Sequence, residues 1–362
     1  MHRSQAAIVG RTGFSLCEVL WLGLIIATAQ AKARATHAKK PPDRLLTRAA
    51  QQGVPGQGRQ GVIHANFCKL ALALFATLTA SAAELPKKPP VGFSGTSALS
   101  FTHAVVTLGP RPAGSRPHVA TELYIESQIK LQKAEFLTDA FTAKTPAGPV
   151  PMKNIIARFR GTTGRAIVFS GHYDTKKMAG FWGANDGGSS TGLLLEMLRV
   201  LGKQKHPDDI YLVWFDGEEA VREWTASDSL YGSRHLEEKW AADGTLSHIK
   251  ALINVDMIGD KGLDIAKEEN SSKSLMKLVW DTARELGYAK YFLNDEEPID
   301  DDHMPFVRAG VNAIDLIDLD FGPKNSFWHT TKDTMDKLSA HSLQVVGDVL
   351  MGVLKKLDAG RS

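Results

Sequence analysis

Cysteine is nearly absent from this chain of 362 residues. Its two cysteines, Cys17 and Cys68, both lie in an N-terminal segment that we expect to stand apart from the folded body. Because the body contains no thiol, neither disulfide bonds nor cysteine nucleophiles are expected to contribute to its stability or activity. The chemistry has to come from other side chains.

Strong charge and internal repeats are missing as well. The net charge is only +3, and no basic run with interleaved aromatic residues occurs, so nucleic-acid binding is not expected. The composition, with 43% hydrophobic and 23% charged residues, is that of an ordinary globular protein with enough apolar material for a core.

The first 83 residues resemble a leader rather than a part of the fold. Residues 62–82 match a signal peptide, because Lys69 precedes a short apolar run and Ala80-Ser81-Ala82 forms a small-residue cleavage pattern. The run is too short to span a membrane stably. We therefore expect a mis-called upstream start, export to the periplasm or medium, and no stable membrane span after removal of the leader. The alternative is a leader that is kept as an anchor.

After the leader, residues 84–102 are expected to form an extended lead-in and residues 103–362 the folded domain. Apolar runs alternate with amphipathic segments along this domain. Strands are predicted at 154–160, 166–170, 211–214, 251–255 and 311–317, and helices at 118–133, 192–201, 271–286 and 339–357. This order predicts a single three-layer α/β domain with a mostly parallel, mixed sheet and helices on both faces.

Two adjacent glutamates, Glu218 and Glu219, directly follow the predicted strand at 211–214. Unpaired carboxylates at the end of a buried strand are unfavourable unless a metal or a proton offsets them. A Glu-Glu pair alone is common on solvated loops, so the pair by itself decides nothing. Further residues with ligand side chains lie at or just after the ends of other strands: His172, Asp174, Asp186, Asp256 and His329.

The number of these residues is more informative than any one of them. A lone histidine is more often a structural residue, an aspartate before glycine is often a turn former, and Asp174 could simply orient His172. However, open α/β sheets place their sites at the carboxyl ends of their strands, where all these residues would meet. One imidazole, one carboxylate from the glycine-rich turn and one from the Glu-Glu pair would form a zinc site with an open position. The other glutamate could then transfer a proton.

Over about residues 103–357, the chain resembles the co-catalytic zinc aminopeptidases and their relatives, the glutaminyl-peptide cyclotransferases. The shared motifs occur in the same order: HYD at 172–174, GANDGG at 183–188, DGEE at 216–219, NVDMIGD at 254–260 and WHT at 328–330. The resemblance implies that Asp186, Glu219 and His329 bind zinc and that Glu218 is the general acid and base. In the peptidases, a second zinc would be bound by His172 and Asp256, and Asp186 would bridge the two metals.

Several features favour the cyclase branch of this family. Trp224, followed by DSLYGSRHL at 228–236, and the double-aspartate segment IDDDHMPF at 299–306 are both similar to cyclase segments. Trp328 occupies a position where the cyclases place a substrate-pocket tryptophan. Departures include Asp300, where animal cyclases carry glutamine, the peptidase-like Gly187-Gly188, and the missing cysteine pair near the HYD motif.

In a cyclase, Trp224 and Trp328 would contact the substrate, although both could be ordinary packing residues. Asp256 and Asp301 would form a hydrogen-bonded catalytic acid pair that shares a proton. Asp301 and Asp302 could instead cap the helix that follows them.

The resulting hypothesis is a secreted glutaminyl-peptide cyclotransferase with one zinc ion that acts on peptide or protein N-termini. The second hypothesis is a di-zinc aminopeptidase. A non-catalytic binding ectodomain is the third, and it is disfavoured because every ligand position and Glu218 are intact.

Overall fold

The computed structural model describes residues 92–360. The expected leader (1–83), with its signal peptide at 62–82, and the lead-in before residue 92 lie outside the described residues. Among the residues that are described, no helix has the length and apolar character needed to cross a membrane.

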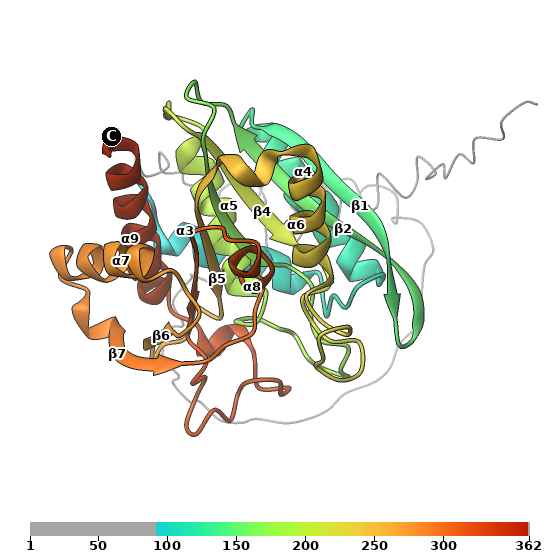
Figure 1. The fold of residues 1–362 in the computed structure, drawn as a ribbon. Coiled ribbons are helices and arrows are strands. Elements are labelled where there is room, and N and C mark those ends of the chain that lie inside the picture. Colours follow the sequence, from blue (N-terminus) through green and yellow to red (C-terminus); the bar gives the residue numbers. More distant parts are fainter. Residues whose placement is uncertain (1–91, 361–362) are drawn as a thin grey trace, which may run out of the picture. The chain divides into compact units, whose positions relative to one another are not determined.

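A six-stranded mixed sheet forms the centre of the domain, with the strand order β1-β2-β4-β3-β5-β8. Figure 1 labels β1, β2, β4 and β5 of this sheet. Its strands are β1 (Glu135–Thr145), β2 (Gly148–Phe159), β3 (Ala166–His172), β4 (Asp209–Phe215), β5 (Ile249–Asp256) and β8 (Ala313–Ile317). The strands β4, β3, β5 and β8 run parallel, and β2 is antiparallel to both of its neighbours. A second, two-stranded parallel sheet consists of β6 (Ile265–Glu268) and β7 (Phe292–Glu297).

Helices cover both faces of the large sheet. They are α3 (Gly95–Thr107), α4 (Arg116–Leu131), α5 (Gly188–Leu201), α6 (Tyr231–Asp243), α7 (Lys273–Glu285), α8 (Met304–Arg308) and α9 (Ala340–Ala359). Short 3-10 turns occur at Thr245–His248, Ala289–Tyr291 and Met335–Lys337.

Alternating residues of β4 show how the layers form. Leu212 and Trp214 belong to an apolar cluster with residues of α3, α4, α5, α7 and α9. Tyr211 and Val213 belong to a second cluster, on the other face, with residues of α6 and α8. Since successive side chains of a strand point to opposite faces, one buried strand supplies both clusters. The predicted three-layer α/β domain with a mostly parallel, mixed sheet is confirmed.

Several elements, β6 and β7 among them, differ from the sequence-based expectation. Residues 95–102 of the expected extended lead-in are helical, because Ser94 accepts the backbone N–H of Ser97 and starts α3, which buries Ala98 and Val105. The strand β1 was not predicted, and it pairs with β2 along its whole length. The cyclase-like segment at 228–236 was not predicted to be helical, and it contains the first turns of α6.

The carboxyl ends of the parallel strands bring distant residues together. β3 ends at His172, which pairs in register with Phe215 at the end of β4. β5 ends at Asp256, opposite Ile317 of β8. The segments after these strands therefore leave the sheet at one edge, as parallel pairing requires.

Candidate active site

Three residues from separate loops meet at this edge of the sheet. Asp186 precedes α5, Glu219 follows β4, and His329 lies in the loop after β8. His329 Nε2 is 3.3 Å from Asp186 Oδ2 and 3.3 Å from Glu219 Oε1. These are the three residues predicted to bind zinc, and their ligand atoms are close enough to share one ion.

The chemistry of this group fits a metal. The Asp186 and Glu219 carboxylates are buried, and among the described residues no hydrogen bond of good geometry reaches Asp186 Oδ2, which is shielded from solvent and lies 3.3 Å from His329 Nε2. A buried carboxylate oxygen without a donor is unfavourable unless a cation binds it. His329 itself has a left-handed backbone, with φ of 49°. Such a conformation costs on the order of 1–3 kcal/mol and is typical of functional sites.

Asp186 also belongs to a second group. Its Oδ1 atom is 3.3 Å from His172 Nε2, and the same nitrogen is 3.1 Å from Asp256 Oδ1. These three residues could hold a second ion. Asp186 thus presents one oxygen to each group, which is the bridging arrangement that the resemblance to the peptidases implied.

His172 is surrounded by carboxylates. Besides the two contacts of Nε2, its Nδ1 atom is 3.5 Å from Asp174 Oδ1 and 3.9 Å from Glu218 Oε2. Burial by itself would lower the pKa of His172, but the negative charges of Asp256 and Glu218 raise it well above the usual 6.5. In the absence of metal, His172 is therefore a cation that balances part of the negative charge.

Glu218 and Glu219 have different surroundings. Burial, and then the charges of Glu219 and Asp301, raise the pKa of Glu218 well above its usual value, against the lowering effect of His172. Glu219 instead accepts the backbone N–H of Lys176 at 3.1 Å, and its other oxygen lies 3.3 Å from Lys176 Nζ. Glu218 thus holds a proton more readily than an ordinary carboxyl group does, and Lys176 fixes Glu219 in place.

Asp256 and Asp301 lie near each other, but in the described part of the chain no hydrogen bond joins them directly. Asn254 Nδ2 donates to Asp301 Oδ2 at 2.9 Å and to Asp315 Oδ1 at 3.1 Å, and Asp301 hydrogen-bonds to Asp315. Burial, together with the charges of Asp186 and Asp301, raises the pKa of Asp256 to about 6. Asp301 and Asp315 therefore share Asn254 as a hydrogen-bond donor, and Asp315 was not predicted from the sequence. The signal was an acid in the middle of the apolar strand AIDLI.

The alternative role of Asp301 and Asp302 as helix caps is not supported. His303 occupies the N-cap position of α8, and no side chain caps this helix. Asp302 is buried, and its burial together with the charge of Asp301 raises its pKa well above the usual value. The two aspartates therefore serve the buried acidic cluster rather than the helix end.

The two predicted substrate-contacting tryptophans are exposed. Trp224 and Trp328 keep 40% and 38% of their surface accessible, which argues against the packing alternative. The Trp328 ring stacks on the ring of His329, with centroids 4.3 Å apart. Trp328 therefore covers one of the proposed zinc ligands and leaves a face free for a ligand.

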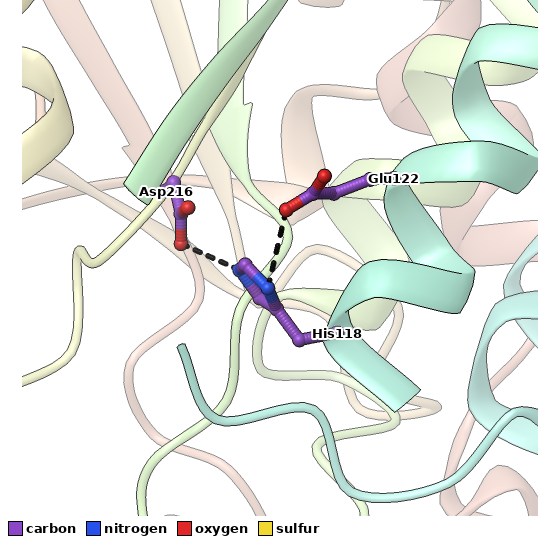
Figure 2. Close-up of side chains that lie close together, drawn as sticks. All are labelled: His118, Glu122 and Asp216. Atoms are coloured by element: carbon purple, nitrogen blue, oxygen red, sulfur yellow. Dashed lines mark hydrogen bonds and ion pairs between the residues drawn. The ribbon is translucent and has the colours of Figure 1, made fainter. Parts of the chain in front are cut away.

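A further buried cluster, of His118, Glu122 and Asp216, was not predicted (Figure 2). His118 Nε2 is 2.7 Å from Asp216 Oδ1, and Nδ1 is 3.3 Å from Glu122 Oε1. The two carboxylates contact opposite nitrogens of the ring, although the three residues also lie close enough together to hold an ion. Lys153 forms an ion pair with Glu122. This cluster is therefore a set of buried ion pairs that holds Asp216, two residues before Glu218.

The comparison with known proteins places this site in a family. The model of peptidase family M28 matches residues 154–354. This chain belongs to peptidase family M28. Within the family, it is similar to the glutaminyl-peptide cyclotransferase of Drosophila melanogaster, with 31% identity over 252 residues that cover 62% of this chain and 70% of that protein.

Solved structures of other M28-like proteins extend the similarity. The glutaminyl cyclase of an Acidobacteriales bacterium has a TM-score of 0.72 and 40% sequence identity, over 76% of this chain and 98% of that one. A leucine aminopeptidase precursor from Bacteroides thetaiotaomicron has a TM-score of 0.67 and 26% identity, over 74% of this chain and 98% of that one. The resemblance inferred from the motifs is thus confirmed, and cyclases and peptidases share this M28 fold.

Proposed function

We propose that this M28 protein is a zinc-dependent glutaminyl-peptide cyclotransferase. It would convert the N-terminal glutamine of a peptide to pyroglutamate and release ammonia. The observation that carries the proposal is the position of Glu218, a buried carboxyl group with a raised pKa, next to the group of Asp186, Glu219 and His329. The relatives named as glutaminyl cyclases support it.

In this reaction the α-amine of the substrate attacks its own γ-carboxamide carbon. A new C–N bond forms, the bond to the amide nitrogen breaks, and ammonia leaves. Bound by Asp186, Glu219 and His329, zinc would supply Lewis-acid polarisation of the γ-carbonyl group. Because amine and carbonyl belong to one residue, the step avoids the entropy loss of a bimolecular encounter.

Glu218 would move the proton. It accepts a proton from the attacking amine nitrogen and delivers it to the departing amide nitrogen, so that no net proton is consumed at this residue. The raised pKa of Glu218 makes its acid form easier to reach than that of an ordinary carboxyl group, so the ionised form can take the proton and the acid form can return it. The neighbouring acids, Asp256 and Asp301, would stabilise the positively charged amine and the leaving group.

The exposed tryptophans would form walls for the substrate. Trp328 is held beside the metal group by its stacking on His329, and Trp224 lies on the loop between β4 and α6. Aromatic walls would favour a compact side chain, which a five-membered ring closure requires.

The second candidate function is that of a di-zinc aminopeptidase. Two observations favour it: the complete group of His172, Asp186 and Asp256, and the similarity to a leucine aminopeptidase precursor. A peptidase must activate water, for which two metals are suited. A cyclase has no such need, and a protonated His172 can supply the positive charge of the second metal.

Assays on two substrates separate these functions. The purified protein is incubated with Gln-β-naphthylamide and, separately, with Leu-p-nitroanilide. Ammonia and a pyroglutamyl product, without release of the aromatic amine, support the cyclase. Release of nitroaniline supports the peptidase, and no reaction with either substrate contradicts both. Zinc content gives an independent measurement, with about one ion per chain expected for the cyclase and two for the peptidase.

We also propose that the protein is exported by the signal peptide at residues 62–82. Mass spectrometry of the mature N-terminus tests this proposal. A mature protein that begins well before Ala82 would contradict it.

A further inference from the structure

Two buried charged residues that do not belong to the metal groups contact the turn that carries Asp186. Arg111 lies between α3 and α4, and Asp333 follows His329 by four residues. The side chains of both are completely buried. Burying charged groups is unfavourable unless they form specific hydrogen bonds, so their contacts call for an explanation.

Within the described residues, the guanidinium group of Arg111 donates its hydrogen bonds to backbone carbonyl groups. Its Nε donates to Tyr173 O at 2.7 Å and its Nη1 to Trp182 O at 2.9 Å. Its Nη2 donates to Gly183 O at 2.7 Å and to Asp186 O at 3.3 Å. One rigid guanidinium thus joins the end of β3 to both ends of the turn at 182–186.

The carboxylate of Asp333 accepts hydrogen bonds from two backbone N–H groups of the same turn. Its Oδ1 accepts the backbone N–H of Asn185 at 2.7 Å, and its Oδ2 accepts that of Asp186 at 3.1 Å. The peptide groups on both sides of the Asp186 side chain are therefore bound, the N–H by Asp333 and the carbonyl by Arg111. Because Asp333 lies in the loop of His329, this contact also links the segments of two proposed zinc ligands.

The turn uses backbone conformations that favour glycine, since Gly183 and Gly187 are left-handed, with φ of 52° and 72°. Besides Arg111 and Asp333, Ser189 Oγ donates to the carbonyl of Asn185 at 2.6 Å, and Asn185 Oδ1 accepts the N–H of Gly259 at 2.8 Å. Gly187 is also the N-cap of α5, and no side chain caps this helix. The direction of the Asp186 side chain therefore depends on contacts from outside the turn.

We propose that Arg111 and Asp333 are positioning residues that fix the backbone of Asp186, so that one carboxylate oxygen faces His172 and the other faces His329. This inference rests on the proposed role of Asp186 as a metal ligand. A rotation of this peptide would move both oxygens, and therefore both groups, at once. Outer contacts of this kind typically change metal affinity by about 10–100-fold.

Asp333→Asn tests the inference, because the amide keeps the shape but replaces one acceptor by a donor that faces an N–H group. We expect the zinc dissociation constant, measured by competition with a chelator, to rise about 10–100-fold. The d–d absorption spectrum of the cobalt(II)-substituted protein should shift as well. Asp336→Asn, the same change at an exposed position three residues further on, should alter neither.

Two additional variants separate positioning from general stability. Val353→Ala removes buried atoms from α9 and should lower the unfolding midpoint without changing the zinc affinity or the cobalt spectrum. Arg111→Lys keeps the charge but loses the planar fork, and it should weaken zinc binding in the same way as Asp333→Asn. If Asp333→Asn does not fold, Arg111→Lys provides the test of the positioning role.

Asp186→Asn is the reference that separates the two proposals. If this variant binds zinc as tightly as the wild type, the proposed metal site is wrong. If it loses zinc while Asp333→Asn and Arg111→Lys keep wild-type affinity and a wild-type cobalt spectrum, the metal site stands and the positioning role is overturned.

Discussion

Trp224 donates its indole N–H to Asp300, with Nε1 3.4 Å from Oδ2. The other oxygen of Asp300 accepts from Arg308 at 3.0 Å. Asp300 is the position at which the chain departs from the glutamine of animal cyclases, and here the acid joins the proposed substrate wall to α8. The contact is exposed and long, so its contribution to binding is small.

Asp300→Ala should therefore loosen Trp224 rather than impair the reaction. We expect KM for a glutaminyl peptide to rise about two- to fivefold, the equivalent of one weak hydrogen bond, with kcat nearly unchanged. Steady-state kinetics measure both values. Asp295→Ala, at an exposed position on β7, is the control, and a fall in kcat at constant KM would show that Asp300 has another role.

Glu218→Gln tests the assignment of the proton carrier. The amide cannot accept or release the proton, and loss of a general acid and base typically lowers the rate by about 10²–10⁴-fold. Zinc content should stay at the wild-type level, because Asp186, Glu219 and His329 remain. Glu223→Gln, on the exposed loop that follows, should keep full activity. Activity in Glu218→Gln close to that of the wild type would remove Glu218 from the reaction.

The fold and the first layer of the site could be predicted because their signals are local. Apolar runs such as 211–214 mark buried strands, and parallel strands deliver whatever follows them to one edge. Ligand side chains directly after such runs, such as His172 and Glu219, therefore meet with little dependence on the details of packing. The strand β1 gave no such signal, because most of its residues are only partly buried.

The residues that support the site could not be predicted in this way. Arg111 donates to backbone carbonyls of several segments, and only the assembled fold shows which carbonyls need a donor. Asp333 acts on N–H groups nearly 150 positions earlier in the sequence. In the sequence, Asp315 is a single acidic residue within a strand. Its contact with Asp301 forms only when the segment that carries Asp301 packs against β8.

His118→Gln tests the buried cluster that holds Asp216. Removing one partner of a buried ion pair typically lowers the free energy of unfolding by about 3–5 kcal/mol. Burial alone would lower the pKa of His118, but Asp216 and Glu122 raise it above 6.5. The contribution of the His118 charge is therefore fully present below pH 6.5 as long as Asp216, whose own pKa is raised by burial, stays ionised, and it is lost as the pH rises through the raised value of His118.

Urea unfolding of both proteins over a range of pH checks this prediction. The difference between wild type and His118→Gln should be largest in mild acid and should shrink in alkali. His248→Gln, at an exposed position, should match the wild type throughout. A difference that grows with pH would mean that His118 is neutral in the folded state.

Glu268 and His303 form a second buried pair, which fixes the segment that begins with Asp301. Glu268 Oε2 is 2.9 Å from His303 Nε2, and both side chains are fully buried. Burial alone would raise the pKa of Glu268, but hydrogen bonds from His303, Asn270 and Ser271 lower it from the usual 4.5 to about 2. The stabilisation is therefore present above pH 4.5 and is lost as the pH falls towards 2.

Glu268→Gln removes this dependence on pH. At pH 7 the variant should be less stable, by up to about 3 kcal/mol if the whole pKa shift is expressed as stability. Between pH 4.5 and 2 the wild type should lose that advantage, and its free energy of unfolding should approach that of the variant. The variant has no titrating group at this position. Unfolding midpoints measured across this range decide the question, with the exposed Glu285→Gln as control. A constant difference between wild type and Glu268→Gln down to pH 2 would mean that packing at this position, rather than the charge of Glu268, stabilises the segment that carries Asp301.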